Sequence, residues 1–131
     1  MSSDLLFSNF LRCCDNVPDR LALLYKGDGI SYAELGRNVN RIANLVAHRV
    51  QNKVGPVAVF LDDALQQVVS IIGVSVSGHP FVPVNTSWPS QRIERALAKI
   101  QPVAIISDDV NCMKVKNFNE EKEVPIISTI N

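Results

Sequence analysis

Three features of the sequence predict an α/β fold in which helices flank a mainly parallel sheet. Segments with helical hydrophobic periodicity alternate with short apolar segments, as expected when helices connect parallel strands. Two of the short segments, residues 56–61 and 103–107, are apolar almost throughout, which is typical of parallel strands buried on both faces. The chain has 131 residues, 47% of them hydrophobic, so it is long enough to form one domain, or a piece of one, with a real core.

The first part of the chain predicts a helix and then a hairpin. Apolar residues within residues 4–14 recur at roughly helical spacing, and Pro18 lies just beyond the expected end of this helix. Residues 21–25 are typical of a short strand. The Lys-Gly-Asp-Gly sequence at residues 26–29 predicts a tight turn in which Asp-Gly supplies the positive φ, and Ile30 begins the return strand.

A capping box predicts where the longest helix begins. The Ser31 side chain can accept a hydrogen bond from the third helical amide, while Glu34 can reach back to the Ser31 amide. Ile30 and Leu35 are placed to form a hydrophobic staple across this start. An apolar stripe at helical spacing then continues to about residue 50. Its members are Leu35, Val39, Ile42, Ala43, Val46 and Val50.

The middle of the chain predicts a buried strand followed by a buried helix. The strand is residues 56–61, and either Asp62 or Asp63 is expected to cap the helix that follows. Because this helix has little polar surface, most of it should be buried. Gly78 suits the left-handed residue that commonly follows a helix.

The next segments predict an edge strand and an amphipathic helix. Pro83 confines the strand at residues 81–84 to an edge or an irregular position. Pro89 suits the first position of the helix, and Pro102 ends it. The apolar positions of this helix are Ile93, Ala96, Leu97 and Ile100.

The pattern weakens after the buried strand at residues 103–107. Residues 114–123 are polar and charged, which is typical of a solvated segment, and residues 124–127 predict one last strand. We therefore expect residues 1–131 to form a single partial domain in which residues 110–131 are a poorly defined tail.

Composition excludes several classes of protein. Thirteen Lys and Arg balance thirteen Asp and Glu, whereas a nucleic-acid-binding domain normally carries a basic excess, so we expect no nucleic-acid partner. The longest apolar stretch, residues 68–76, is too short for a membrane span. Three cysteines without a signal-peptide pattern fit a reducing compartment, so we expect a cytoplasmic protein.

The sequence shows no catalytic constellation. It contains no G-x-x-x-x-G-K-[ST] phosphate loop, no G-x-G-x-x-G after a strand and no G-x-S-x-G. His48 and His79 have no partner at metal-ligand spacing. Cys13 and Cys14 are expected to pack at the end of the first helix. We therefore predict no catalytic, cofactor-binding or metal-binding residue in this chain.

Two features have both a functional and a structural interpretation. Asp62 and Asp63 follow a strand, at the carboxyl edge where α/β sheets place ligands, and paired carboxylates there are suited to acid–base or metal chemistry. The favoured interpretation is a helix cap, because capping explains the position fully. Trp88 is suited to stacking on a ligand, but we favour a loop anchor packed on the core.

Two motifs resemble those of the adenylate-forming enzymes, the AMP-dependent synthetases and ligases. Residues 30–35, Ile-Ser-Tyr-Ala-Glu-Leu, and residues 40–43, Asn-Arg-Ile-Ala, resemble the family's first core motif. Residues 77–85, Ser-Gly-His-Pro-Phe-Val-Pro-Val-Asn, followed by Trp-Pro and Arg-Ile pairs, resemble the second. The resemblance covers roughly residues 7–109.

Some residues depart from the family pattern. Asn85 stands where Asp is usual, and His79-Pro80 replaces small residues. These departures leave the subfamily open among enzymes that activate β-alanine, enzymes that activate aminoadipate and general acyl-CoA synthetases.

The resemblance implies the N-terminal part of an AMP-binding enzyme's large domain. The parent enzymes use ATP and Mg²⁺ to convert a carboxylate to an acyl adenylate and then transfer the acyl group to a thiol. Their catalytic motifs lie later in the chain and have no matching positions here, so no catalytic residue is carried over. The chain is expected to resemble the first quarter of such a ligase, without ATP or Mg²⁺ bound to it, and to be inactive alone.

Two other functions remain open. The chain could be a non-catalytic module that docks on a partner or on a full-length paralogue, because its apolar helix and incomplete sheet leave apolar surface and an unpaired strand edge exposed. It could also be a free-standing flavodoxin-like domain with a small ligand of its own, although it contains no loop to cradle a phosphate. If the chain is instead the first part of a ligase, its partner is the remainder of the ligase polypeptide.

Overall fold

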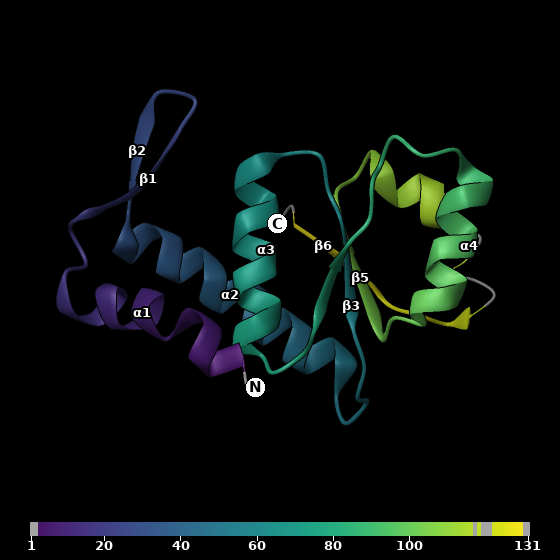
Figure 1. The fold of residues 1–131 in the computed structure, drawn as a ribbon, viewed down its shortest axis with the longest axis horizontal. Coiled ribbons are helices and arrows are strands. Elements are labelled where there is room, and N and C mark those ends of the chain that lie inside the picture. The colour runs from purple at the N-terminus through teal and green to yellow at the C-terminus, as the bar shows by residue number, and fades with distance from the viewer. Residues whose placement is uncertain (1–2, 117, 119–121, 130–131) are drawn as a thin grey trace.

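Helices and strands alternate along the chain, which confirms the predicted α/β class. The computed structural model describes residues 3–116, 118 and 122–129. The elements are α1 (Ser3–Asn16), β1 (Leu21–Tyr25), β2 (Asp28–Ser31), α2 (Tyr32–Val50), β3 (Val57–Phe60), α3 (Ala64–Val76), β4 (Phe81–Pro83), α4 (Ser90–Ile100), β5 (Ala104–Ser107), the 3-10 helix η1 (Asn111–Val115) and β6 (Ile126–Ser128) (Figure 1). No helix in the described ranges is long and apolar enough to cross a membrane.

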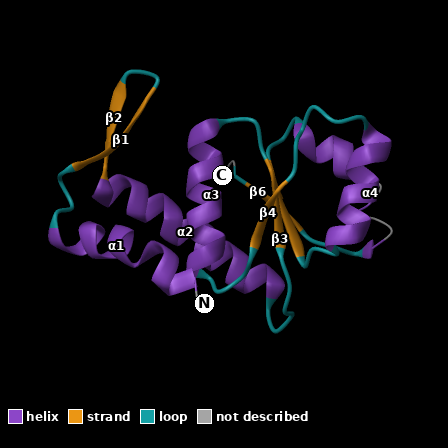
Figure 2. Cartoon of the chain, viewed as in Figure 1, coloured by secondary structure: helices purple, strands orange, loops and turns teal. Residues whose placement is uncertain are grey.

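Four parallel strands form the main sheet, in the order β4-β3-β5-β6. The central strand β3 pairs Val57 with Phe81 of β4 on one side and with Ala104 of β5 on the other. β4 is at an edge, where Pro83 is tolerated because no ladder amide is required of it. Figure 2 shows this sheet standing between α1, α2 and α3 on one side and α4 on the other.

Each face of the sheet has its own core. Alternate residues of β3 point to opposite faces: Val57 and Val59 join the core under α2 and α3, whereas Ala58 and Phe60 join the core under α4 and η1. All four side chains are buried. The sheet therefore separates two apolar clusters, each covered by the helices on its own face.

The local signals for α2 and α3 are confirmed. Ser31 caps α2, and its Oγ accepts a hydrogen bond of 3.2 Å from the Glu34 amide. Asp63, the second of the two candidate caps, caps α3, with its Oδ2 accepting from the Gln66 amide at 2.9 Å. Gly78 follows α3 with a φ of +92°, as predicted for a left-handed residue.

The β1–β2 hairpin extends away from the sheet (Figure 1), and its turn differs from the prediction. Lys26 and Gly27 have positive φ values of 51° and 84°, whereas Asp28 lies in β2 and pairs with Tyr25. The predicted Asp-Gly turn was wrong because two positive-φ residues suffice for a tight hairpin, and Gly27 already supplies one.

A bulge gives the hairpin an apolar outer face. The pairing register shifts between Leu21 and Leu23, so Leu21 and Leu24 both lie over Gly29. Their side chains are 53% and 68% exposed. The hairpin therefore carries one of the uncovered apolar surfaces among the described residues.

Other differences are confined to the ends of elements. Pro89 is the cap of α4 rather than its first helical residue, and Gln101 ends that helix in a left-handed conformation before Pro102. The last strand begins at Ile126, not at residue 124. The 3-10 helix η1 was not predicted, because five residues without a helical stripe give no periodic signal.

Candidate functional site

The carboxyl ends of β3 and β5 form the position at which a parallel sheet normally binds a ligand. From β3 the chain turns to α3 on one face, whereas from β5 it turns to η1 on the opposite face. Such a reversal opens a crevice between two strands in many α/β proteins. Asp62 lies just beyond β3, and Asp108 follows β5 directly.

The side chain of Asn111 closes this crevice. Its Nδ2 donates to Asp62 Oδ2 at 3.0 Å and to Asp108 Oδ2 at 2.9 Å, and its backbone amide donates to Asp108 Oδ1 at 2.7 Å. Asn111 is only 1% exposed, and its Oδ1 has no partner among the described residues. The space between β3 and β5 is therefore filled by a structural cross-link.

Asp62 is held in its charged form by neutral donors. The Thr86 hydroxyl donates to Asp62 Oδ1, and this bond, followed by that from Asn111, lowers the pKa of Asp62 below its usual value. The Lys114 ammonium adds a smaller effect in the same direction, and it donates to the Thr86 carbonyl oxygen at 3.0 Å. Both carboxylate oxygens thus already accept hydrogen bonds.

Asp63 has a separate set of partners. Desolvation raises its pKa, but the hydrogen bonds from the Tyr25 hydroxyl and the Gln66 amide outweigh desolvation, so the pKa of Asp63 lies below its usual value. The capping interpretation is confirmed for Asp63, whereas Asp62 joins β3 to the β4–α4 loop and to η1. The adjacent carboxylates therefore serve two different networks and do not converge on one point.

An open pocket of about 360 Å³ lies beside Asp62. Its wall includes Gln67, Thr86 and Trp88. Trp88 packs partly against the core under α4, as the anchor interpretation predicts, and the Arg92 guanidinium stacks on its ring at 4.1 Å from the centroid. Sequence reasoning missed Thr86 and Asn111, because neither belongs to a local motif.

The other candidate residues do not join this edge of the sheet. His48 lies in the last turn of α2, and His79 Nδ1 lies 3.1 Å from the Gly55 carbonyl oxygen. Cys13 and Cys14 are half-buried near the end of α1, and the Cys14 thiol donates to the Tyr32 carbonyl oxygen. Burial, reinforced by Asp15, raises the pKa of the Cys14 thiol. That shift makes it a poor nucleophile.

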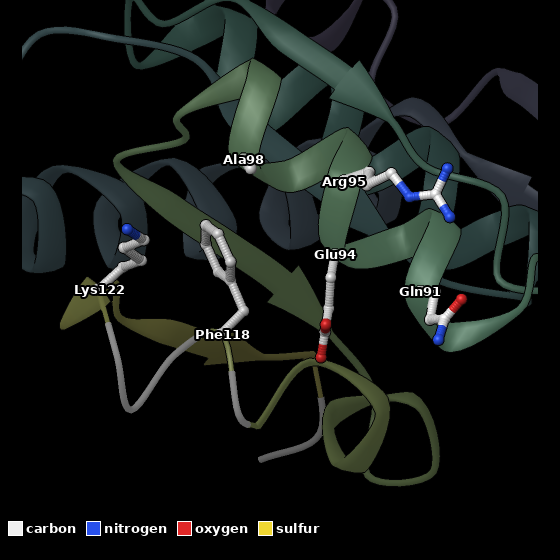
Figure 3. Close-up of a pocket in the computed structure, with 6 residues that line it drawn as sticks. All are labelled: Gln91, Glu94, Arg95, Ala98, Phe118 and Lys122. Atoms are coloured by element: carbon white, nitrogen blue, oxygen red, sulfur yellow. The ribbon is translucent and has the colours of Figure 1, made fainter.

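A larger hollow of about 410 Å³ lies beside α4 (Figure 3). Gln91, Glu94, Arg95 and Ala98 come from α4, and Phe118 and Lys122 come from the segment below it. The described residues of its wall include one carboxylate and two cations but no cysteine, histidine or hydroxyl nucleophile. This hollow therefore has the character of a charged surface depression.

The described residues do not suit a bound nucleotide with its metal ion. No three His, Cys, Asp or Glu side chains among them lie together in a group able to hold a metal. No glycine lines the pocket beside Asp62, where a phosphate would need close backbone approach.

Comparison with known proteins places this fold in a large group of ligases. Residues 10–130 match the family described as "AMP-binding enzyme". The chain is 27% identical over 138 residues to the D-alanine–D-alanyl carrier protein ligase of Lacticaseibacillus casei, covering 95% of this chain and 27% of the relative. It is also 30% identical over 106 residues to the N-(5-amino-5-carboxypentanoyl)-L-cysteinyl-D-valine synthase of Penicillium rubens, covering 77% of this chain but only 3% of that synthase.

Solved structures share the fold. The crystal structure of apo MatB from Rhodopseudomonas palustris superimposes on 98% of this chain with a TM-score of 0.80 and 22% sequence identity. The superposition uses 25% of the MatB chain. The chain thus spans about a quarter, or much less, of these relatives. Since the family match extends over nearly the whole chain, the predicted resemblance is confirmed, and the chain belongs to the AMP-binding enzyme family of adenylate-forming ligases.

Proposed function

We propose that this chain supplies the N-terminal part of an ATP-dependent, carboxylate-activating ligase and does not activate a carboxylate by itself. In the whole enzyme, a carboxylate oxygen attacks the α-phosphorus of ATP, pyrophosphate leaves, and a thiol then displaces AMP from the acyl adenylate. Mg²⁺ offsets the phosphate charge in such reactions. The family match over residues 10–130 carries this proposal.

The hydrogen bonds at the carboxyl edge support a structural role for this chain. Asn111 joins the two carboxylates that follow β3 and β5, and Thr86 occupies the remaining oxygen of Asp62. These groups stabilise the edge of the sheet and leave no free acid–base pair there. The partner is then the remainder of the ligase polypeptide, in the cytoplasm.

The decisive experiment compares two polypeptides in an ATP–pyrophosphate exchange assay. The first is the 131-residue chain, and the second is the product of the full native reading frame, obtained by sequencing the transcript through its 3′ end. Offered mixed amino acids and short carboxylic acids, only the longer polypeptide should exchange pyrophosphate into ATP. Exchange by the 131-residue chain, or micromolar ATP binding to it in calorimetry, would contradict the proposal.

A second candidate function is suggested by the hairpin. Leu21 and Leu24 form an exposed apolar face, and such a face on a short product would suit docking on a full-length paralogue. If the transcript stops after Asn131, purified chain should co-sediment with that paralogue, and Leu24→Lys should weaken the complex. Equal co-sedimentation of the wild type and the variant would contradict docking through this face.

A further inference from the structure

A small pocket lies between α2 and α3, away from Asp62 and its network. Its volume is about 180 Å³, well below the roughly 300–1,000 Å³ of sites for drug-sized ligands. α2 contributes Asn38, Arg41 and Ile42 to its wall; α3 contributes Leu65, Gln66, Val69 and Ser70; and Thr129 follows β6. Figure 1 shows α3 beside the end of β6, where these segments meet.

The polar side of this pocket is rich in hydrogen-bond donors. The Arg41 guanidinium donates to the Thr129 carbonyl oxygen at a long 3.4 Å, and a guanidinium carries five N–H donors. The Thr129 hydroxyl donates to Gln66 Oε1 at 3.1 Å, which directs that amide's acceptor to Thr129 and leaves its NH₂ group for other partners. No carboxylate lines the pocket among the residues that the structure describes.

A buried hydroxyl in the wall supports a polar occupant. Ser70 is 0% exposed, and its Oγ has no hydrogen-bond partner among the described residues. Buried polar groups in folded proteins are nearly always hydrogen-bonded. Ser70 lines this pocket, so a polar group bound there is a candidate partner for its hydroxyl.

The opposite side of the pocket is apolar. Ile42, Leu65 and Val69 form it, and Ile42 and Val69 belong to the buried core. Donors and one cation on one side, with aliphatic side chains on the other, match a molecule that has an anionic head and a short hydrocarbon tail. Inorganic phosphate offers only the first of these features.

We propose that this pocket binds a small aliphatic carboxylate, with the carboxylate group on Arg41 and Gln66 and the tail on Ile42, Leu65 and Val69. The site is independent of the proposed function, because none of its residues belongs to the Asp62 network and binding requires no ATP. The affinity is expected to be weak, with a dissociation constant on the order of 1 mM, since a single half-exposed ion pair and a few methyl contacts provide it.

The test titrates the ¹⁵N-labelled 131-residue chain with butyrate at constant ionic strength and follows amide chemical shifts. The amides of Asn38, Arg41, Gln66 and Ser70 should shift with saturation. Butyramide, which has the same shape without the charge, should bind at least about tenfold more weakly, because charge-assisted hydrogen bonds are roughly twice as strong as neutral ones. Phosphate should also bind more weakly, since it has no tail.

Variants separate the site from general charge effects. Arg41→Gln should abolish the saturable shifts, Arg41→Lys should retain part of the affinity, and Arg37→Gln, on the exposed face of the same helix, should bind as the wild type does. Unchanged thermal unfolding of Arg41→Lys guards against loss of fold. Equal binding of butyrate and butyramide, equal binding by Arg41→Gln, or an absence of saturable shifts would overturn the proposal.

Discussion

Asn111 determines how the carboxyl edge of the sheet is held at the scale of single residues. Its amide group lies between two carboxylates and donates to both. Without that group, Asp62 and Asp108 would each lose one donor and their negative charges would be less well compensated, although Asp62 keeps the Thr86 hydroxyl and Asp108 keeps the Asn111 backbone amide. Asn111 thus connects the two carboxylates through hydrogen bonds.

Replacement of Asn111 should therefore be costly. We expect Asn111→Ala to lower the free energy of unfolding by about 1–3 kcal/mol, because it removes two hydrogen bonds that a buried side chain makes to carboxylates. Urea denaturation at neutral pH measures this loss. Asn44→Ala on the exposed face of α2 is the matched control and should change stability by less than about 0.5 kcal/mol; equal losses in the two variants would contradict the bridging role.

Asp62 should make stability depend on pH. Because hydrogen bonds from Thr86 and Asn111 lower its pKa in the folded chain, its contribution is fully present above the ordinary carboxyl pKa of about 3.9. The contribution is lost as the pH falls through that value toward the lower, folded pKa. Urea midpoints measured down the acidic range should fall less steeply for Asp62→Asn than for the wild type, while the exposed Asp19→Asn should follow the wild type. Parallel curves for Asp62→Asn and the wild type would contradict the assignment.

At the scale of elements, Gly73 sets the distance between α2 and α3. A Cβ atom at this position would lie 2.7 Å from Ile42 Cγ2 and 3.1 Å from the Val39 carbonyl oxygen. Both of these residues are fully buried and belong to the helix facing it. The absence of a side chain at Gly73 is therefore what allows the two helices to approach.

Gly73→Ala should destabilise the chain despite alanine's higher helix propensity. Overpacking costs about 1–3 kcal/mol, whereas the gain in propensity is about 1 kcal/mol, so we expect a net loss in chemical denaturation. Val68→Ala, at an exposed position of the same helix, controls for the effect of alanine and should be nearly neutral. A stabilised Gly73→Ala would show that the helices can separate without cost.

A side-chain hydrogen bond from the Tyr25 hydroxyl to Asp63 joins the hairpin to the start of α3. Tyr25→Phe removes the donor and should cost about 0.5–1.5 kcal/mol. The effect should be local, because the ring stays in place. Hydrogen exchange should accelerate at the paired amides of β1 and β2 and stay unchanged in α4; uniform acceleration would mean that the bond stabilises the whole fold.

Contacts between residues close in sequence could be predicted from the sequence, whereas contacts between distant residues could not. The Ser31 cap was predictable because its partner, Glu34, is in the same turn. The partners of Asp62 were not predictable, because Thr86 and Asn111 are 24 and 49 positions away in sequence. A single sequence does not indicate which loops meet at a sheet edge. The predicted position of the hairpin turn was wrong for another reason. Gly27 and Gly29 could each supply the positive φ of the turn, and the pairing of β1 with β2 places the turn at Gly27.

At the scale of the whole molecule, the two cores share one sheet. Val57 and Val59 serve one cluster, and Ala58 and Phe60 serve the other, so breaking β3 exposes both. We therefore expect a single unfolding transition. Fluorescence of the only tryptophan, Trp88, reports on the α4 side, and circular dichroism reports mainly on the longer helices opposite. Coincident midpoints would support this expectation, and separate midpoints would show two independent units.

The parallel order of the sheet also has a consequence for synthesis on the ribosome. Val57 in β3 pairs with Phe81 and with Ala104, so both of its partners are synthesised after it. By contrast, β1 and β2 pair with each other across a short turn, and such local contacts form quickly. A growing chain therefore presents β3, the most apolar strand, for a long interval before it can be paired. During that interval, chaperones and aggregation compete for the nascent polypeptide.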